Sequence, residues 1–264
     1  MAVSYIIILL CGLIIGSFIN VCIYRIPLGK SIVAPPSACT SCGKRLVASD
    51  LVPIFSYFLL RGRCRHCRTP ISPRYPLVEF LTALVFIALF IRYGYTIPFI
   101  AFAFLMAVLI IVFFIDVDHR IIPDELVIAG IIGGAVLLGY NFFRPLTEVF
   151  GDGKWWTPVA GFFSGSGFLL LIALLGLFIY KTDDAMGMGD VKLMAPIGLF
   201  LGWRLCLTSL FISVLLAGVT SLGLILLRIK KKKDTIPFGP FIVTGTFLTI
   251  MWGWELLNWY TGLR

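Results

Sequence analysis

The chain has 264 residues, of which 59% are hydrophobic and only 13% are charged, and its mean hydropathy is +1.01. Soluble domains carry about 25% charged residues, so this composition excludes an ordinary soluble protein and indicates a protein that crosses a membrane several times. The net charge of +9 would suggest a nucleic-acid partner for a soluble protein. In a membrane protein the distribution of the positive residues matters more than their total, and we expect no nucleic-acid partner.

Apolar runs of spanning or near-spanning length follow one another at about 3–24, 77–93, 96–115, 124–141, 157–180, 190–203, 205–228 and 236–260. A helix needs about 20 residues to cross a bilayer. The pattern predicts an all-α, polytopic membrane helix bundle with about eight spans. Because the run at 190–203 is short and contains Pro196 and Gly202, seven spans with a partial or re-entrant helix there is the alternative. No Lys or Arg precedes the first run, so we expect a retained first helix and not a cleaved signal peptide.

The positive residues predict the orientation of these spans. With eight spans and the N-terminus outside, the loops at 25–76, 116–123, 181–192 and 229–235 fall on the cytoplasmic side. Together with Arg228 they hold 17 of the 22 Lys and Arg residues. Cytoplasmic loops carry such an excess. The same assignment places two acidic motifs, around Asp116 and Asp190, at similar depth on the cytoplasmic side.

The longest hydrophilic segment, 25–76, contains two CxxC pairs, Cys39 with Cys42 and Cys64 with Cys67, separated by 21 residues. Paired CxxC motifs are the usual way to offer four thiolates to Zn²⁺, although the common spacer is about 15–20 residues. A site closed by four cysteines is normally structural, so we expect the metal to fold this loop. Unligated thiols, a disulfide or ligation by His66 are the alternatives.

Two further polar residues lie near the first two spans. Gly12 and Gly16 form a GxxxG pair, which permits close helix approach, and Asn20 in the same run needs a polar partner. Asn20 could serve helix packing or contact a substrate. Glu79 lies near the start of the second run, where it could be an interfacial residue favoured by the helix dipole or part of a polar pocket.

The acidic motifs are Ile115-Asp116-Val117-Asp118 and Gly187-Met188-Gly189-Asp190, each at the end of an apolar run. A carboxylate in or near hydrocarbon costs about 2.5–3.5 kcal/mol and is rarely kept without a use. Asp118, His119 and Asp124 could be solvated loop residues, with Asp124 capping a helix. The glycines of the second motif permit a tight turn and the close approach of another segment. If the helices bring Asp116 and Asp190 together, they supply the two parts of an aspartyl protease dyad.

These motifs resemble the bacterial type IV prepilin peptidases, which are membrane-embedded GxGD aspartyl proteases. The resemblance covers most of the chain, in GSFINVCIYRIP at 16–27, the four cysteines, ISPRYPLVE at 71–79, IDVDHRIIPDEL at 115–126, GMGDVKL at 187–193 and IPFGP at 236–240. It implies that Asp116 and Asp190 are catalytic and that the basic leader of a prepilin or pseudopilin is removed. It also implies N-methylation of the new N-terminus with S-adenosylmethionine, and from the residues Glu79 is the candidate for this step.

The resulting expectation is a multi-pass protein of the bacterial inner membrane with its active site facing the cytoplasm. Its parts are a first transmembrane helix (1–24), a cytoplasmic zinc loop (25–76) and a transmembrane aspartyl peptidase core (77–264). Partners are the pilin-like substrates, membrane lipid and pilus or type II secretion assembly proteins. The alternatives from other classes are an ion-coupled transporter, in which intramembrane aspartates relay ions, and a non-catalytic assembly factor that docks through the zinc loop.

Overall fold

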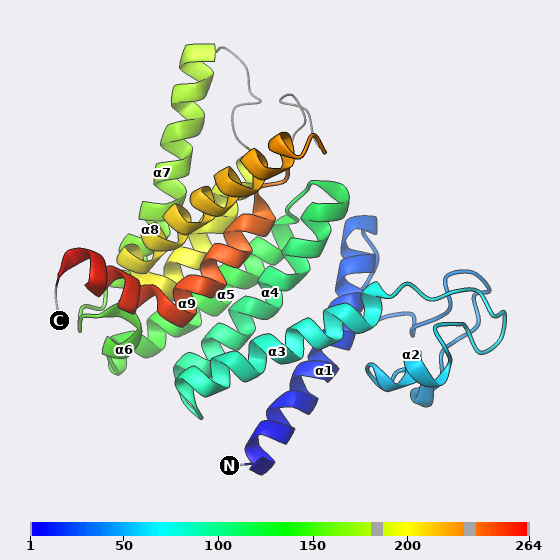
Figure 1. Cartoon of the computed structure of the whole chain (residues 1–264). Helices are drawn as coiled ribbons and strands as arrows, with labels where there is room; N and C mark the ends of the chain where they lie inside the picture. The colour runs from blue at the N-terminus through cyan, green and yellow to red at the C-terminus, as the bar shows by residue number, and fades with distance from the viewer. Residues whose placement is uncertain (1, 181–186, 230–235, 263–264) are drawn as a thin grey trace. The chain divides into compact units, whose positions relative to one another are not determined.

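The computed structural model describes residues 2–180, 187–229 and 236–262, and within these ranges it consists of helices without a β-strand (Figure 1). The long helices are α1 (Ala2–Arg25), α3 (Arg74–Tyr93), α4 (Ile97–His119), α5 (Asp124–Phe143), α7 (Thr157–Tyr180), α8 (Met188–Leu226) and α9 (Gly239–Thr261). Four short helices lie between them, η1 (Ile26–Leu28), η2 (Ala48–Asp50), α2 (Phe55–Leu59) and α6 (Thr147–Phe150). The predicted all-α class is confirmed.

Seven of the described helices are long and apolar enough to cross a membrane, compared with the eight spans predicted. The predicted runs at 190–203 and 205–228 both belong to α8, which is interrupted at Gly202 by a non-helical φ of +71° and ψ of 170°. A Cβ built on Gly165 would lie 3.1 Å from Met194 Cε and 2.5 Å from Cys206 Sγ. A straight helix would separate those two residues by about 18 Å.

The chain therefore reverses at Gly202, and α8 consists of two segments (Figure 1). The first segment, 188–201, is shorter than the about 20 residues that a span requires. The runs at 190–203 and 205–228 are thus two separate helical segments, as predicted, and the first of them is the partial helix of the alternative. Parts of the predicted loops 181–192 and 229–235, including Asp183, Asp184 and the lysines at 230–233, lie outside the described residues.

The chain divides into two compact units, residues 1–99 and residues 100–264. In the first unit α1 packs on α3, and the GxxxG pair lies at this contact. A Cβ on Gly12 would lie 2.6 Å from Ala83 Cα, and a Cβ on Gly16 would lie 2.6 Å from Glu79 Cα. Any larger residue would push the two backbones apart, so the predicted role of the pair in close helix approach is confirmed. The boundary between the units lies after α3, whereas the sequence suggested a functional division at residue 77.

In the second unit α8 packs against α5, α7 and α9. Glycines again mark the closest crossings, because a Cβ on Gly161 of α7 would collide with the Gly198 carbonyl of α8. The second segment of α8 is joined to α9 by a buried hydrogen bond of 3.0 Å between the hydroxyls of Ser209 and Thr246. In a membrane, where lipid offers no hydrophobic drive for helix association, small residues and hydroxyl contacts of this kind hold helices together.

The two ends of α5 carry different polar groups. Near its last residue, the loop to α7 contains Asp152, which accepts a hydrogen bond of 2.6 Å from the Thr157 hydroxyl and lies 3.7 Å from Arg204. Near its first residue, Asp124, lie both acidic motifs. Arg204 and the acidic motifs thus lie at opposite ends of α5, as the charge pattern predicted.

Candidate active site and metal centre

Asp116 lies in the last turn of α4 and is 6% exposed. Its carbonyl accepts the amide of Arg120, whose φ of +56° ends the helix and turns the chain away. The positive charge of Arg120 acts on the Asp116 carboxylate. The sequence places Asp116 after a run of apolar residues, so helix periodicity carries its side chain toward the protein interior and leaves Val117 and Asp118 exposed.

Asp190 lies in the first turn of α8, whose N-cap is Gly187, and its side chain is half-buried. Neither Gly187 nor Gly189 has a positive φ, so the backbone conformation does not require glycine at these positions. Close contacts with neighbouring atoms require it instead. A Cβ on Gly187 would lie 3.1 Å from Asp190 Oδ2. A Cβ on Gly189 would lie 3.1 Å from Ile122 Cβ, in the segment that follows Asp116. The GxGD turn therefore packs directly on the segment that follows the other acidic motif, as predicted for the approach of another segment.

Asp116 and Asp190 line one cavity of about 440 Å³, together with 120–122, Asp124, 187–189 and Lys192. Their carboxylates are close enough to interact electrostatically. The structure thus brings together the two acidic residues that the sequence singled out, although they are 74 positions apart in the chain. An acidic pair in a cavity between buried helices can hold and transfer a proton.

A third element reaches the pair from the other end of the sequence. The backbone amide of Gly239, the first residue of α9, donates a buried hydrogen bond of 3.1 Å to Asp116 Oδ2. A Cβ at this position would lie 2.6 Å from the same oxygen. The IPFGP motif was part of the family resemblance, but no function could be assigned to it from the residues. A backbone donor leaves no side-chain signal. Only a glycine directly before the proline at the start of a helix could have suggested a close contact here.

The neighbouring polar residues have other positions. Asp118 is exposed. Asp124 does not cap α5, because the N-cap is Pro123 and no side-chain cap bond forms. Asp124 instead forms an exposed ion pair of 2.8 Å with Lys192, two residues after Asp190. This pair joins the start of α5 to the start of α8 at the rim of the cavity.

The four cysteines of the predicted zinc loop come together in the first unit. The Sγ atoms of Cys39, Cys42, Cys64 and Cys67 all lie within 4.8 Å of one another. The two CxxC pairs have the same backbone form, since Gly43 donates to the Cys39 carbonyl and Arg68 donates to the Cys64 carbonyl. Gly43 and Arg68 both have positive φ, of 70° and 60°. Each pair is thus a tight knuckle that points two thiols toward the other pair.

The spacing and chemistry of these thiols suit a tetrahedral metal. Four sulfurs at about 2.3 Å from zinc lie about 3.8 Å apart, and the Sγ atoms of Cys39 and Cys67 are 3.8 Å apart. A hydrogen bond to the Thr69 hydroxyl, with help from the Thr69 amide, lowers the pKa of the Cys67 thiol to about 6. Backbone amides of Cys42 and Ser41 lower the pKa of Cys39. A hydrogen bond from the Lys44 amide lowers the pKa of Cys42, but desolvation and the neighbouring thiols raise it to about 11. Metal ligation requires the thiolate form, which the contacts at Cys39 and Cys67 favour.

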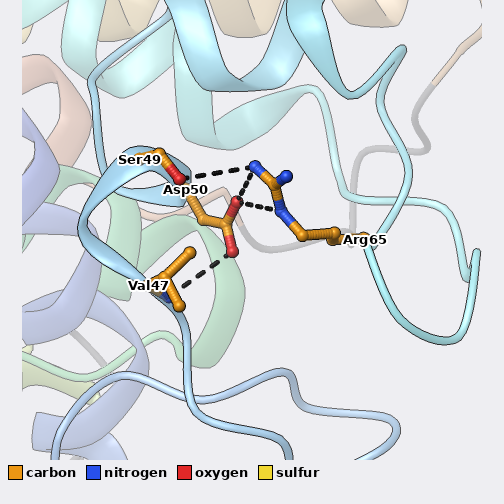
Figure 2. Close-up of polar contacts among 4 residues, drawn as sticks. All are labelled: Val47, Ser49, Asp50 and Arg65. Carbon is orange, nitrogen blue, oxygen red and sulfur yellow. Dashed lines mark hydrogen bonds and ion pairs between the residues drawn. The ribbon is translucent and has the colours of Figure 1, made fainter.

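An ion pair fixes the second knuckle to the spacer between the cysteines (Figure 2). Arg65, between Cys64 and Cys67, donates from Nε and Nη2 to Asp50 Oδ1 at 2.8 and 2.7 Å. The Asp50 side chain is only 3% exposed, and its second oxygen accepts the amide of Val47 at 3.4 Å. The sequence did not single out Asp50, because a lone aspartate in a hydrophilic loop carries no signal.

Glu79 is buried, at 8% exposed, in the second turn of α3 and not in its first turn. This position does not fit the interpretation that the helix dipole favours Glu79, because the dipole acts mainly in the first turn. Its Oε2 accepts a hydrogen bond of 2.7 Å from the amide of Ile54, and the Ser17 hydroxyl also interacts with it. Asn20 finds its polar partner in the Tyr75 carbonyl, at 3.0 Å. Glu79 and Asn20 therefore lie where α1, α3 and the zinc loop meet.

The chain is a multi-pass membrane protein whose helices hold two acidic side chains in one cavity. Its residues 10–93 match the bacterial peptidase A24 N-terminal domain, and residues 103–222 match the type IV leader peptidase family. These two matches end and begin close to the boundary between the two compact units. No solved structure matches the chain.

Several relatives carry the name prepilin leader peptidase/N-methyltransferase. The protein of Aeromonas hydrophila is 33% identical over 276 residues, which cover 95% of this chain and 91% of the relative. That of Bacillus subtilis (strain 168) is 32% identical and covers 94% of each chain. That of Legionella pneumophila is 32% identical over 98% of this chain and 94% of its own. The chain therefore belongs to the type IV leader peptidase family.

Proposed function

We propose that this protein cleaves the leader peptide from type IV prepilins or pilin-like secretion proteins, with Asp116 and Asp190 as its catalytic pair. The observation that carries the proposal is the shared cavity, in which both carboxylates lie at the ends of apolar helices and interact with each other. The names of the relatives support the same reaction.

The cleavage chemistry follows from the pair. Two interacting carboxylates hold one proton between them near neutral pH, because ionising both in one cavity is costly. The ionised member takes a proton from a water molecule, which attacks the scissile carbonyl, and the protonated member donates a proton to the carbonyl oxygen. The roles exchange as the intermediate collapses, so neither residue is assigned one role alone. No covalent intermediate is needed.

We propose that the pair faces the cytoplasm from the bacterial inner membrane. Most of the positive residues fall in the loops that share the side of the acidic motifs, and such loops stay in the cytoplasm. A basic leader that remains in the cytoplasm would then reach the pair from that side. Contacts with pilus or type II secretion assembly proteins would follow from the same location.

We propose that Cys39, Cys42, Cys64 and Cys67 bind one structural Zn²⁺. The clustered thiols and the lowered pKa values of Cys39 and Cys67 support this site. A metal closed by four cysteines has no open position for a substrate, so it would supply a cross-link between the two knuckles and no chemistry. The metal would thereby hold together a loop whose strand pairing is limited to two isolated bridges.

The second proposed activity is N-methylation of the new N-terminal residue with S-adenosylmethionine, which the names of the relatives support. We propose that Glu79 serves this step by accepting the proton that the amine loses. Its burial and its position between α1, α3 and the zinc loop favour Glu79 over Asp50, the one acid of that loop, which is held by Arg65. The hydrogen bond to Ile54 also gives Glu79 a structural role, which a test must separate from the chemical one.

Incubation of the purified protein with a prepilin tests both activities together. Mass spectrometry should show the mature protein without its leader, and a further gain of one methyl group only when S-adenosylmethionine is present. In the Glu79→Gln protein, whose amide oxygen can still accept the Ile54 amide, cleavage should continue at the correct bond while methylation falls. An uncleaved prepilin in the wild-type reaction would contradict the proposed function.

A further inference from the structure

The first unit contains a second cavity, of about 490 Å³, that takes no part in the proposed cleavage. We propose that this tyrosine cavity, lined by Asn20, Tyr24, Tyr57, Tyr75 and Glu79 together with both knuckles, binds the methyl donor S-adenosylmethionine. The inference rests on the proposed methylation and adds the location and the recognition chemistry of its co-substrate.

The size and the walls of the cavity suit a small molecule. Small-molecule sites enclose about 300–1,000 Å³ and combine apolar or aromatic walls with a few placed polar groups. Here α1 supplies Asn20 and Tyr24, α2 supplies Tyr57, and α3 supplies Tyr75 and Glu79. The remaining wall comes from the zinc loop, including Cys39 and Cys64. The cavity is thus formed by elements that all belong to one compact unit.

The charge of the donor suits the aromatic and acidic groups in these walls. A sulfonium is a cation that cannot donate a hydrogen bond through its sulfur, so aromatic faces and carboxylates are the groups that attract it. The tyrosine cavity offers three phenol rings and the buried Glu79 carboxylate. Two arginines also line it, but Arg25 is bonded to the Ser31 and Pro35 carbonyls and Arg65 is paired with Asp50. The Tyr24 ring already attracts one cation, since Lys30 Nζ lies 5.8 Å from its centroid. A purine ring can stack on the same kind of aromatic surface.

A strained residue lies at the carboxylate. Ile54 donates its amide to Glu79 with φ of 62° and ψ of −54°, a conformation that is unfavourable for a β-branched residue. Strain of this kind persists where the surrounding structure forces it, and it is frequent at ligand-binding segments. The strained turn holds one oxygen of Glu79 and so fixes the direction in which the carboxylate faces the cavity.

The transfer step balances with these groups. The neutral N-terminal amine attacks the methyl carbon, an N–C bond forms, and the S–C bond breaks with its electron pair left on sulfur. The donor becomes a neutral thioether, and the methylated ammonium then gives a proton to the Glu79 carboxylate. The sulfonium charge and the carboxylate charge are both consumed, so a carboxylate beside the donor favours the step as well as binding.

Binding of tritiated S-adenosylmethionine to the full-length, zinc-containing protein in detergent tests the site without relying on catalysis. We expect Tyr24→Leu and Glu79→Gln to weaken binding by about tenfold or more, the size of a desolvated cation–π or charge contact. Tyr24→Phe, which keeps the ring, should bind far better than Tyr24→Leu. Tyr5→Leu is the matched control, because Tyr5 lies on the same helix with similar exposure but outside the cavity.

Photolabelling of the unmutated protein locates the bound donor directly, so the proposal can still be tested if a variant fails to fold. Ultraviolet cross-linking of the tritiated donor should place the label in peptides from residues 17–79. Label in residues 100–264, or wild-type binding by both Tyr24→Leu and Glu79→Gln, would overturn the proposed location. A protein that cleaves prepilin but does not bind the donor at all would overturn the proposed methylation itself.

Discussion

The amide of Gly239 and the carboxylate of Asp116 are joined by a buried hydrogen bond of 3.1 Å across 123 positions of the chain. This bond places the start of α9 against the end of α4, beside the GxGD turn of α8. Three helix ends thus meet around one carboxylate pair. Farther along the same helices, the hydroxyl contact between Ser209 and Thr246 holds α9 on α8. The position of Gly239 is therefore fixed by its own bond to Asp116 and by this contact between α8 and α9.

Replacing Gly239 with Ala should strongly impair cleavage. The added Cβ would lie 2.6 Å from Asp116 Oδ2, so either the carboxylate or the start of α9 must move. Displacing a catalytic group by about 1 Å can cost on the order of 100-fold in rate. Cleavage kinetics should show a fall in kcat with a KM near that of the wild type, because Gly239 acts through Asp116.

The matched control is Gly218→Ala, since nothing lies within 4 Å of a Cβ at Gly218. That variant should cleave at the wild-type rate. Equal rates for the Gly239→Ala and wild-type proteins would show that the hydrogen bond to Asp116 does not position the catalytic pair.

The zinc site predicts a defined metal content. Protein purified without chelators should contain about one Zn²⁺ per chain, and joint replacement of Cys39 and Cys42 with Ser should remove it. Because the metal would cross-link the knuckles, its loss should lower thermal stability and methylation before it affects cleavage. Elemental analysis that finds no zinc in the wild-type protein would rule out this site, and Cys11→Ser is a control outside the cluster.

At the crossing of α7 and α8, we expect a larger residue to lower the stability of the protein without acting on the catalytic pair directly. A Cβ on Gly161 would collide with the backbone of Gly198, so Gly161→Ala should destabilise the protein by about 1–3 kcal/mol through overpacking. Thermal unfolding in detergent measures the loss. Gly167 lies on the same helix with nothing within 4 Å of its Cβ, and Gly167→Ala should leave the melting temperature almost unchanged. Equal melting temperatures for both variants would contradict this packing.

Much of the candidate site could be predicted because its residues contrast with their surroundings. Carboxylates at the ends of apolar runs are costly, which singled out Asp116 and Asp190, and paired CxxC motifs singled out the knuckles. The distribution of Lys and Arg along the chain was enough to place both acids on one side of the membrane. The GxxxG pair likewise predicted the close contact of α1 with α3.

Other features depend on contacts that a local pattern does not carry. The sequence predicted a break between the runs 190–203 and 205–228, but it did not show that the chain reverses there through a positive φ at Gly202. The Gly239 donor is a backbone group. Asp124 is exposed, as one of the two expectations had it, but its ion pair with Lys192, 68 positions away, could not be foreseen. Glu79 was placed too near the helix start, so its contact with Ile54 could not be foreseen.

Cleavage of a prepilin by conservative aspartate variants tests the catalytic pair most directly. Asparagine keeps the size of aspartate but removes the charge and the titrating proton that hydrolysis requires. Asp116→Asn and Asp190→Asn should each abolish processing. Asp118→Asn and Asp124→Asn, which alter an exposed residue and a rim ion pair, should retain it in part. Full processing by the Asp190→Asn protein would contradict the proposed dyad.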